Sequence, residues 1–209
     1  MNEPARDCAL CPRLVEFRER NRRDHRAWHN APVPSFGGED ARLLIVGLAP
    51  GLKGANRTGR PFTGDYAGDL LYPTLIRYGL AQGHYQAVPE DGLRLIKARI
   101  TNAVRCVPPQ NKPQGQELAA CRPFLQDEIE GLPELKVILA LGRVAHDAVL
   151  TTLGHKKSAY PFVHGAVHEF QSGPPLIDSY HCSRYNTNTK RLTEAMFHAV
   201  FETVAARLK

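Results

Sequence analysis

Two uninterrupted apolar runs constrain the fold of this chain more than any other feature. One follows Arg42 and extends to Gly47, and the other follows Lys136 and extends to Gly142. A strand without alternation of apolar and polar residues is covered on both faces, which is typical of a parallel sheet. Two further strands are predicted at residues 99–105 and 175–180.

Helical patterns separate these strands. They cover residues 12–27, 71–80, 116–129 and 144–150, and a stripe with a period of 3.6 residues runs from Leu192 to Leu208. Strands that alternate with helices imply βαβ units, and hence an α/β fold with a parallel sheet flanked by helices. A length of 209 residues without internal repeats predicts a single domain, 1–209.

The charge balance and the apolar segments limit the partners. A formal net charge of +6 suits a polyanion such as nucleic acid, although many basic proteins bind none. The first seven residues hold no apolar signal segment, and no run approaches 18 apolar residues. We therefore expect a cytoplasmic protein, associated with the nucleoid, that does not enter a membrane.

The chain contains five cysteines, which in a reducing compartment are expected to be ligands, catalytic groups or buried residues. Cys8 and Cys11 form a C-x2-C pair, Cys106 ends the second predicted strand, and Cys121 lies in the next helix. Four thiolates hold either a zinc ion or a four-iron four-sulfur cluster, and spacing does not decide between them. Unrelated buried thiols are the alternative. Cys182 stands apart, beside a loop after the last strand.

A long glycine-rich segment, residues 47–68, follows the first strand. Glycine lets backbone N–H groups approach a ligand closely. No Gly-Lys-Ser or Gly-Lys-Thr follows, so the segment is not a P-loop. Parallel sheets bind ligands beyond the carboxyl ends of their strands, where residues 47–68, 102–109 and 181–188 are expected to converge on one site.

Taken together, these segments resemble the uracil-DNA glycosylase superfamily, specifically its family 5. The resemblance extends from residue 8 to about 193 and rests on the cysteine pattern and on Gly47–Gly51, Gly54–Asp65, Thr101–Cys106 and His181–Asn188. It implies an α/β/α sandwich with a central four-stranded parallel sheet. It also implies a structural four-iron four-sulfur cluster on Cys8, Cys11, Cys106 and Cys121.

The activity that the resemblance implies is hydrolysis of the N-glycosidic bond of uracil, and of hypoxanthine or other deaminated bases, in single- or double-stranded DNA. A monomeric enzyme would leave an abasic site for base excision repair. Such enzymes extrude the damaged nucleotide and bind its base in a pocket. The base leaves with negative charge, which the pocket should stabilise.

Three side chains are candidates for holding the base. Phe62 would stack on it, Asn102 would bind its Watson–Crick edge, and His181 would donate a hydrogen bond to uracil O2 as charge develops. The alternatives are a core Phe and a turn Asn. Gly47, Leu48 and Ala49 are expected to line the same pocket.

Placing the attacking water is a further task, for which a weak base is adequate if the bond breaks before the water arrives. Other branches of the superfamily carry an acidic residue at one of the two positions after the first glycine of the motif, where this chain has Leu48 and Ala49. Asp65 is the nearest carboxylate and is predicted to position the water or stabilise the cation. The alternative is an Asp that caps a turn beside Gly64.

The segment after His181 is expected to meet the duplex. Arg184 or Tyr185 would fill the gap left by the extruded nucleotide, and Asn186 would contact the substrate. Cys182 departs from the His-Pro-Ser tripeptide of the relatives, which leaves open whether it ligates the cluster. Phosphate contacts are expected from Arg57, Arg60, Lys112, Lys190 or Arg191, with a solvated surface charge as the alternative for each.

Three other functions fit parts of the pattern. A non-catalytic iron–sulfur or zinc module that binds nucleic acid is the main alternative. An enzyme that hydrolyses nucleotides is disfavoured because no clustered carboxylates for magnesium are evident. An electron carrier would need a cluster that mild reductants reach.

Overall fold

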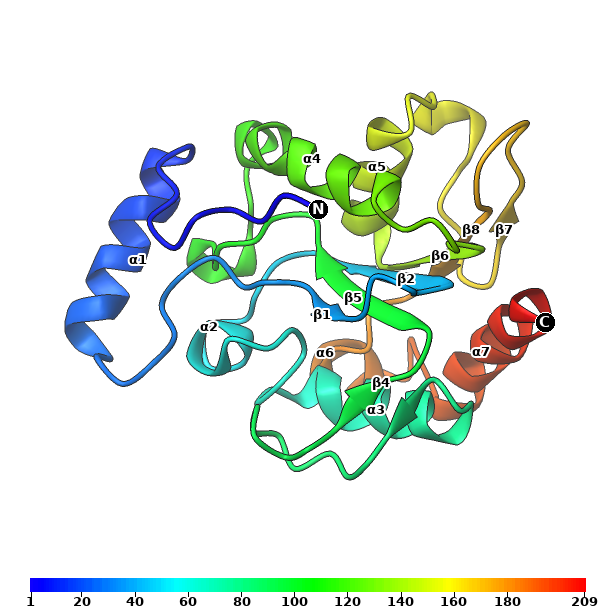
Figure 1. The fold of residues 1–209 in the computed structure, drawn as a ribbon, viewed down its shortest axis with the longest axis horizontal. Helices are drawn as coiled ribbons and strands as arrows, with labels where there is room; N and C mark the ends of the chain where they lie inside the picture. Colours follow the sequence, from blue (N-terminus) through cyan, green and yellow to red (C-terminus); the bar gives the residue numbers. More distant parts are fainter.

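A computed structural model describes residues 1–209, in which helices cover both faces of a six-stranded sheet (Figure 1). The strand order is β1-β5-β2-β6-β8-β7. The four central strands are parallel to one another and every residue in them is buried: β5 (Ala98–Asn102), β2 (Leu43–Gly47), β6 (Val137–Leu141) and β8 (Leu176–Ser179). The predicted α/β sandwich with a four-stranded parallel centre is confirmed.

The complete sheet is larger than predicted and is mixed. β1 (Phe36–Gly37) pairs antiparallel with β5, and β7 (Val167–His168) pairs antiparallel with β8. A separate two-stranded sheet joins β3 (Ala81–Gln82) to β4 (Arg94–Leu95). These strands have two residues each, too few to show a periodicity of two. The prediction of four strands is therefore correct only for the centre of the sheet.

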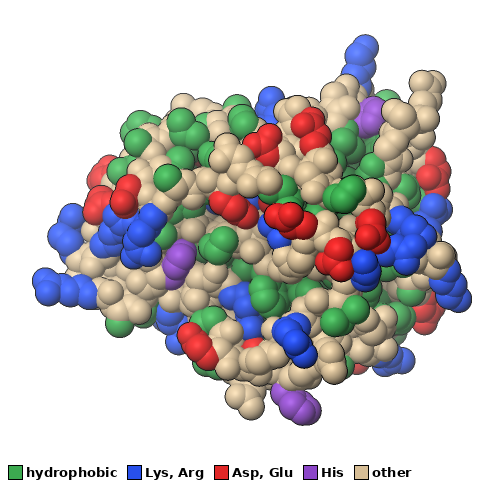
Figure 2. All heavy atoms as spheres, in the orientation of Figure 1, with side chains coloured by type: hydrophobic (Ala, Val, Ile, Leu, Met, Phe, Trp, Pro, Cys, Tyr) green, Lys and Arg blue, Asp and Glu red, His purple; other side chains and the backbone are tan.

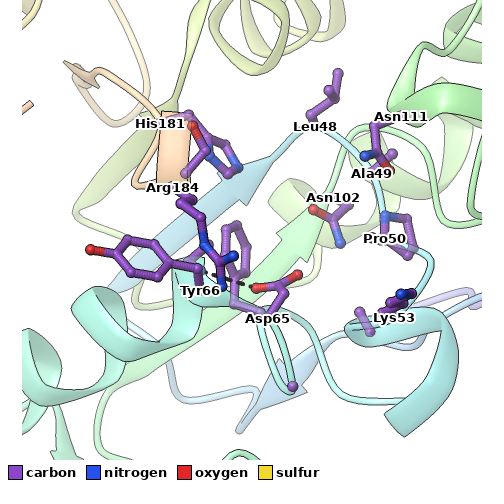
Figure 3. A pocket seen from close by; sticks show the side chains of 16 residues that line it. Leu48, Ala49, Pro50, Lys53, Asp65, Tyr66, Asn102, Asn111, His181 and Arg184 are labelled. Atoms are coloured by element: carbon purple, nitrogen blue, oxygen red, sulfur yellow. Dashed lines mark hydrogen bonds between the residues drawn. The ribbon is translucent and has the colours of Figure 1, made fainter. Parts of the chain in front are cut away.

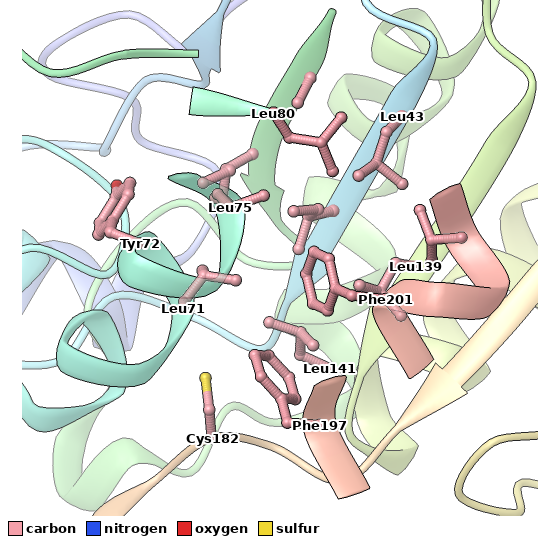
Figure 4. Packing of buried hydrophobic residues seen from close by; sticks show 14 of the residues in the cluster. Leu43, Leu71, Tyr72, Leu75, Leu80, Leu139, Leu141, Cys182, Phe197 and Phe201 are labelled. Atoms are coloured by element: carbon pink, nitrogen blue, oxygen red, sulfur yellow. The ribbon is translucent and has the colours of Figure 1, made fainter. Parts of the chain in front are cut away.

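Alternate side chains of the central strands enter two different cores. On one face, Leu43 and Ile45 pack with α3 (Tyr66–Arg77) and α7 (Glu194–Leu208), as Figure 4 shows for Leu43. On the other face, Leu44 and Val46 pack with α4 (Gly115–Glu130) and α5 (Arg143–Thr152). This alternation is the reason for the uninterrupted apolar run, since both faces of β2 are covered.

The carboxyl ends of the parallel strands meet at one edge of the sheet, where the remaining elements gather. The chain continues there from β2 into α2 (Ala55–Thr58), from β5 into η1 (Pro109–Asn111), and from β8 into α6 (Arg184–Asn188). The N-terminal helix α1 (Pro12–Asp24) leads to the same edge, since His29 donates a backbone hydrogen bond to Arg57 of α2. No helix has the length and apolarity of a membrane span.

Candidate active site

A cavity of about 590 Å³ opens at this edge of the sheet (Figure 3). It is lined by the three segments that the sequence predicted to converge. The predicted site residues on its wall are Leu48, Ala49, Phe62, Asp65, Asn102, His181 and Arg184. Gly47 and Asn186 do not line the cavity. Each lies next to a residue that does.

Gly47 is the last residue of β2 and lies opposite Asn102 in the parallel register. A Cβ atom at Gly47 would lie 2.4 Å from Asn102 Oδ1 and 2.6 Å from Phe62 Cζ. Any larger residue would therefore push these two side chains apart. Glycine is required here because the amide and the ring meet directly over the end of the strand.

Phe62 forms one wall of the cavity in a constrained backbone conformation. Its φ is +52°, a left-handed value that is costly for a bulky residue, and its side chain is almost fully buried. The ring stacks against His181 with centroids 5.7 Å apart. The hydroxyl of Tyr85 donates to the Phe62 carbonyl at 3.2 Å. Neighbouring groups thus hold the ring where a planar ligand could stack on it.

His181 follows β8 and directs its ring toward the cavity (Figure 3). Its Nδ1 atom is buried and has no hydrogen-bond partner in the protein. Burial lowers the pKa of His181 to about 4, so the imidazole is neutral at pH 7. The Asn186 side chain donates to the His181 carbonyl at 2.8 Å. Asn186 therefore supports the backbone of His181 and does not line the cavity.

Asp65 divides its two carboxylate oxygens between the fold and the cavity. Oδ1 accepts the backbone N–H of Ala67 at 3.2 Å and caps α3, as the turn-capping alternative predicted. Oδ2 lies over the glycine loop, 2.3 Å from where a Cβ of Gly54 would be and 3.0 Å from that of Gly51. Burial raises the pKa of Asp65, against the effect of the capping hydrogen bonds. Asp65 therefore both caps α3 and lines the cavity.

Arg60 does not reach the surface, which removes it from the five candidates for contact with phosphate. Its guanidinium donates to both oxygens of Asp91, each at 2.7 Å, and lies 5.2 Å and 5.3 Å from the ring centres of Phe36 and Tyr72. Thr63 Oγ1 accepts a further hydrogen bond from Arg60 Nε at 2.7 Å. The side chain fastens the loop that carries Phe62 and Asp65.

The sequence reasoning missed Asn111 and Lys53, which also line the cavity. Asn111 follows Gln110, and both have left-handed backbones with φ of +55° and +57°. Arg13 braces this segment by donating to the Lys112 carbonyl at 3.0 Å. The only sequence signal was a pair of polar residues in a proline-rich connection, where Asn tolerates positive φ.

The four predicted ligand cysteines line one small apolar hollow between α1, the segment after β5, and α4. No three of their sulfur atoms lie within 4.8 Å of one another. Around a single zinc ion, bonds of about 2.3 Å would bring four sulfurs to about 3.8 Å. The spacing is therefore wide for one zinc ion. The cysteines concerned are Cys8, Cys11, Cys106 and Cys121.

Arg18 supplies a cation to the same hollow. The residue is 3% exposed, and Nη1 donates to the Cys8 carbonyl at 3.0 Å. The buried Nε has no hydrogen-bond partner, although it lies 3.8 Å from Glu19 Oε1. A buried guanidinium with an unused donor suits an anionic group, as a thiolate-bound iron–sulfur cluster is. The donor set and its surroundings fit that cluster.

Cys182 lies elsewhere. It is fully buried in the core formed with α3 and α7, and burial raises the pKa of its thiol (Figure 4). The hollow of the other four cysteines belongs to a different cluster of buried residues. Cys182 is a core residue and does not replace a ligand.

Comparison with known proteins agrees with this geometry. The family described as the uracil DNA glycosylase superfamily matches residues 34–205. A Type-5 uracil-DNA glycosylase of Thermus thermophilus is 50% identical over 195 residues, covering 91% of this chain and 89% of the relative. A Type-5 enzyme of Pyrobaculum aerophilum is 39% identical, covering 96% and 88%. A Type-4 enzyme of Sulfurisphaera tokodaii is 31% identical, covering 81% and 73%. The resemblance to family 5 is confirmed, and the chain belongs to the uracil DNA glycosylase superfamily.

Proposed function

We propose that this protein is a monofunctional DNA glycosylase that hydrolyses the N-glycosidic bond of uracil, and of hypoxanthine or other deaminated bases, in single- or double-stranded DNA. The abasic site that remains would enter base excision repair. The observation that carries this proposal is the cavity wall itself. An aromatic ring, a buried side-chain amide and a neutral histidine with a bare nitrogen converge there.

Each of these groups has a task in base recognition. The base of an extruded nucleotide stacks on Phe62, which contributes about 1–3 kcal/mol for an aromatic–base contact. Asn102 offers both a donor and an acceptor to the Watson–Crick edge. The neutral His181 ring carries one N–H, which donates to the base as its negative charge grows.

Asp65 serves the sugar side of the reaction. Leu48 and Ala49, which also line the cavity, have no proton acceptor, whereas Asp65 Oδ2 lies over the glycine loop. Its carboxylate would position the attacking water and stabilise the cationic sugar. The capped Oδ1 holds the group in place because α3 begins at the next residue.

We propose that the four clustered cysteines bind a four-iron four-sulfur cluster with a structural role. When bound, the cluster would cross-link α1, the segment after β5, and α4 through thiolates. Arg18 would offset its negative charge. The support is the shared apolar hollow and the unused Arg18 donor. The ligands would be Cys8, Cys11, Cys106 and Cys121.

DNA would approach across the rim of the cavity. Arg184 or Tyr185 would fill the gap in the duplex. In support, Arg184 lies on the cavity wall with its guanidinium 5.4 Å from the Tyr66 ring, and Tyr185 is 72% exposed. Lys53 and Arg57 are exposed near α2. Lys and Arg side chains also gather over α1 (Figure 2). One chain completes the cavity, so we propose a monomer that acts on chromosomal DNA in the cytoplasm.

A base-release assay tests the proposal. Purified, cluster-replete protein is incubated with uracil- and hypoxanthine-containing oligonucleotides, and abasic sites are cleaved with alkali. We expect cleavage at the damaged base and strong loss in His181→Ala, Asn102→Ala and Asp65→Ala, but not in His84→Ala, whose side chain is exposed. Binding of the damaged duplex without any base release would favour the non-catalytic module.

A further inference from the structure

Another histidine beside β8, His146, has a different environment from His181. His146 of α5 is 1% exposed, and both of its ring nitrogens are engaged. Nδ1 lies 2.7 Å from Asp178 Oδ1 of β8, and Nε2 lies 2.8 Å from the carbonyl oxygen of Tyr160. The second carboxylate oxygen of Asp178 lies 2.9 Å from His168 Nε2 of β7.

These contacts determine the protonation of His146. The Tyr160 carbonyl is only an acceptor, so Nε2 must carry a proton. The Nδ1–Asp178 contact needs one more proton, and imidazole is a stronger base than a carboxylate by roughly 2.6 pKa units. That proton therefore resides on the ring. An imidazolium at His146 paired with a carboxylate at Asp178 satisfies both contacts.

Residues 160–168, which extend from the Tyr160 carbonyl to His168, pack against residues 178–180, just before His181. Asp178 exchanges backbone hydrogen bonds with this segment, donating to Ala166 O at 3.0 Å and accepting from Gly165 at 2.8 Å. The Tyr180 N–H donates to His164 Nδ1 at 3.0 Å, and the His164 and Tyr180 rings stack at 4.9 Å. Residues 160–168 thus form the support for the residue that precedes His181.

We propose that His146 is a positioning residue: a buried imidazolium that fixes residues 160–168 against β8 and thereby holds His181 in the cavity. This inference rests on the proposed glycosylase function for its kinetic consequence, but not for its structural content. A neutral His146 has one N–H for two acceptors. One of the contacts is then lost, and the support for His181 loosens.

The groups around His146 together raise its pKa. The charged or titratable groups that face His146 are Asp178 on β8, His168 on β7 and Asp147 on α5 itself. Burial lowers the pKa of His146, but the two carboxylates and the Tyr160 carbonyl outweigh it and raise the pKa. The positioning is therefore fully present below the ordinary histidine pKa and lost as pH rises through the raised pKa.

A bound metal ion is the competing interpretation of the same three side chains, whose ligand atoms gather within 4.8 Å. The contact distances of 2.7 Å and 2.9 Å are those of charge-assisted hydrogen bonds. Two ligand atoms about 2.1 Å from a tetrahedral zinc ion would lie about 3.4 Å apart. The geometry thus favours shared protons.

The test begins with 15N-histidine NMR of the full-length, cluster-replete protein at pH 6. We expect His146 to bear protons on both ring nitrogens and His181 on only one. A bare nitrogen on His146, or stoichiometric zinc binding that removes the protons of His146 and His168, would overturn the proposal. This arm uses wild-type protein and does not depend on activity.

Single-turnover base release is then measured against pH for wild type, His146→Gln and the exposed control His84→Gln. We expect His146→Gln to release uracil about tenfold more slowly at pH 6, since displacement of a site group by about 1 Å costs up to about 100-fold. Its rate should lack the alkaline decline of wild type, and its His181 and Tyr180 resonances should shift. An unchanged pH profile with unchanged His181 resonances contradicts the positioning role, whereas inactive wild type contradicts only the glycosylase proposal.

Discussion

His181 and His146 are two histidines beside the same strand, β8, and they differ in what their ring nitrogens meet. Nδ1 of His181 has no partner in the protein, and burial lowers its pKa to about 4. Both nitrogens of His146 have acceptors, and its pKa is raised. An unsatisfied buried polar atom costs stability, and that of His181 belongs to a residue that lines the cavity, where a ligand can satisfy it. The unpartnered ring marks the binding site, and the paired ring marks its support.

The largest effect is expected at Asp65, where one oxygen is paired and the other lies over the glycine loop. Asp65→Asn should slow base release by about 10²- to 10⁴-fold, the range for loss of a catalytic acid–base group. The pKa of Asp65 is raised, so its ionised form destabilises the folded state at neutral pH, and the variant should be more stable. Single-turnover kinetics and thermal unfolding at pH 7 measure both. A variant with full activity would remove Asp65 from the water-positioning role.

His181→Ala is expected to reduce base release by about 10²- to 10³-fold, as for removal of an oxyanion donor. The unfolded state takes up a proton near the ordinary pKa of 6.5, whereas the folded state does so at about 4. Wild type should therefore lose stability as pH falls through this window, and the variant should lose less. Urea unfolding at pH 7 and pH 5 measures the difference. Equal acid sensitivity in both proteins would show that His181 is not buried neutral.

Gly47→Ala tests whether close approach builds the binding wall. The added Cβ would collide with Asn102 and Phe62, and a displacement of about 1 Å is expected to reduce base release by about 100-fold. Gly115→Ala is the matched control, because a Cβ there meets no atom within 4 Å. Kinetics at saturating DNA compare the two. Equal rates would mean that the strand end tolerates separation of the two side chains.

The smallest effect is expected from exposed cations, which act by charge alone. Arg57→Ala should weaken DNA binding and reduce the slope of log affinity against log salt by about 0.9, with little change in base release at saturating DNA. Fluorescence anisotropy at several salt concentrations measures the slope. Arg207→Ala, on α7 and paired with Glu169, should leave it unchanged. An unchanged slope for Arg57→Ala would place this residue outside the DNA interface.

The residues that line the cavity with His181 were predictable from the sequence, because they lie in local motifs at strand ends. Phe62, Asp65, Asn102 and His181 were all predicted to meet, and they do. Their burial and pairing were not predictable. Whether an arginine such as Arg60 faces solvent or an aspartate depends on a loop 31 residues away.

The hydrogen-bond network around His146 could not be predicted from the sequence. His146, His168 and Asp178 share no motif, and they meet because α5 packs beside β8 and β7 pairs with it. A two-residue strand such as β7 shows no periodicity, so neither the sheet edge nor the network could be predicted. Asn111 was missed for a related reason, since left-handed backbone at two successive residues depends on the segment being braced from α1.

Titration of the wild-type protein with free uracil, followed by side-chain NMR of histidine and asparagine, tests the central claim most directly. The account predicts saturable shifts of the His181 ring and the Asn102 amide, with the two protons of His146 retained throughout. Saturating uracil that leaves His181 and Asn102 unshifted would show that the unpartnered groups do not form the base site.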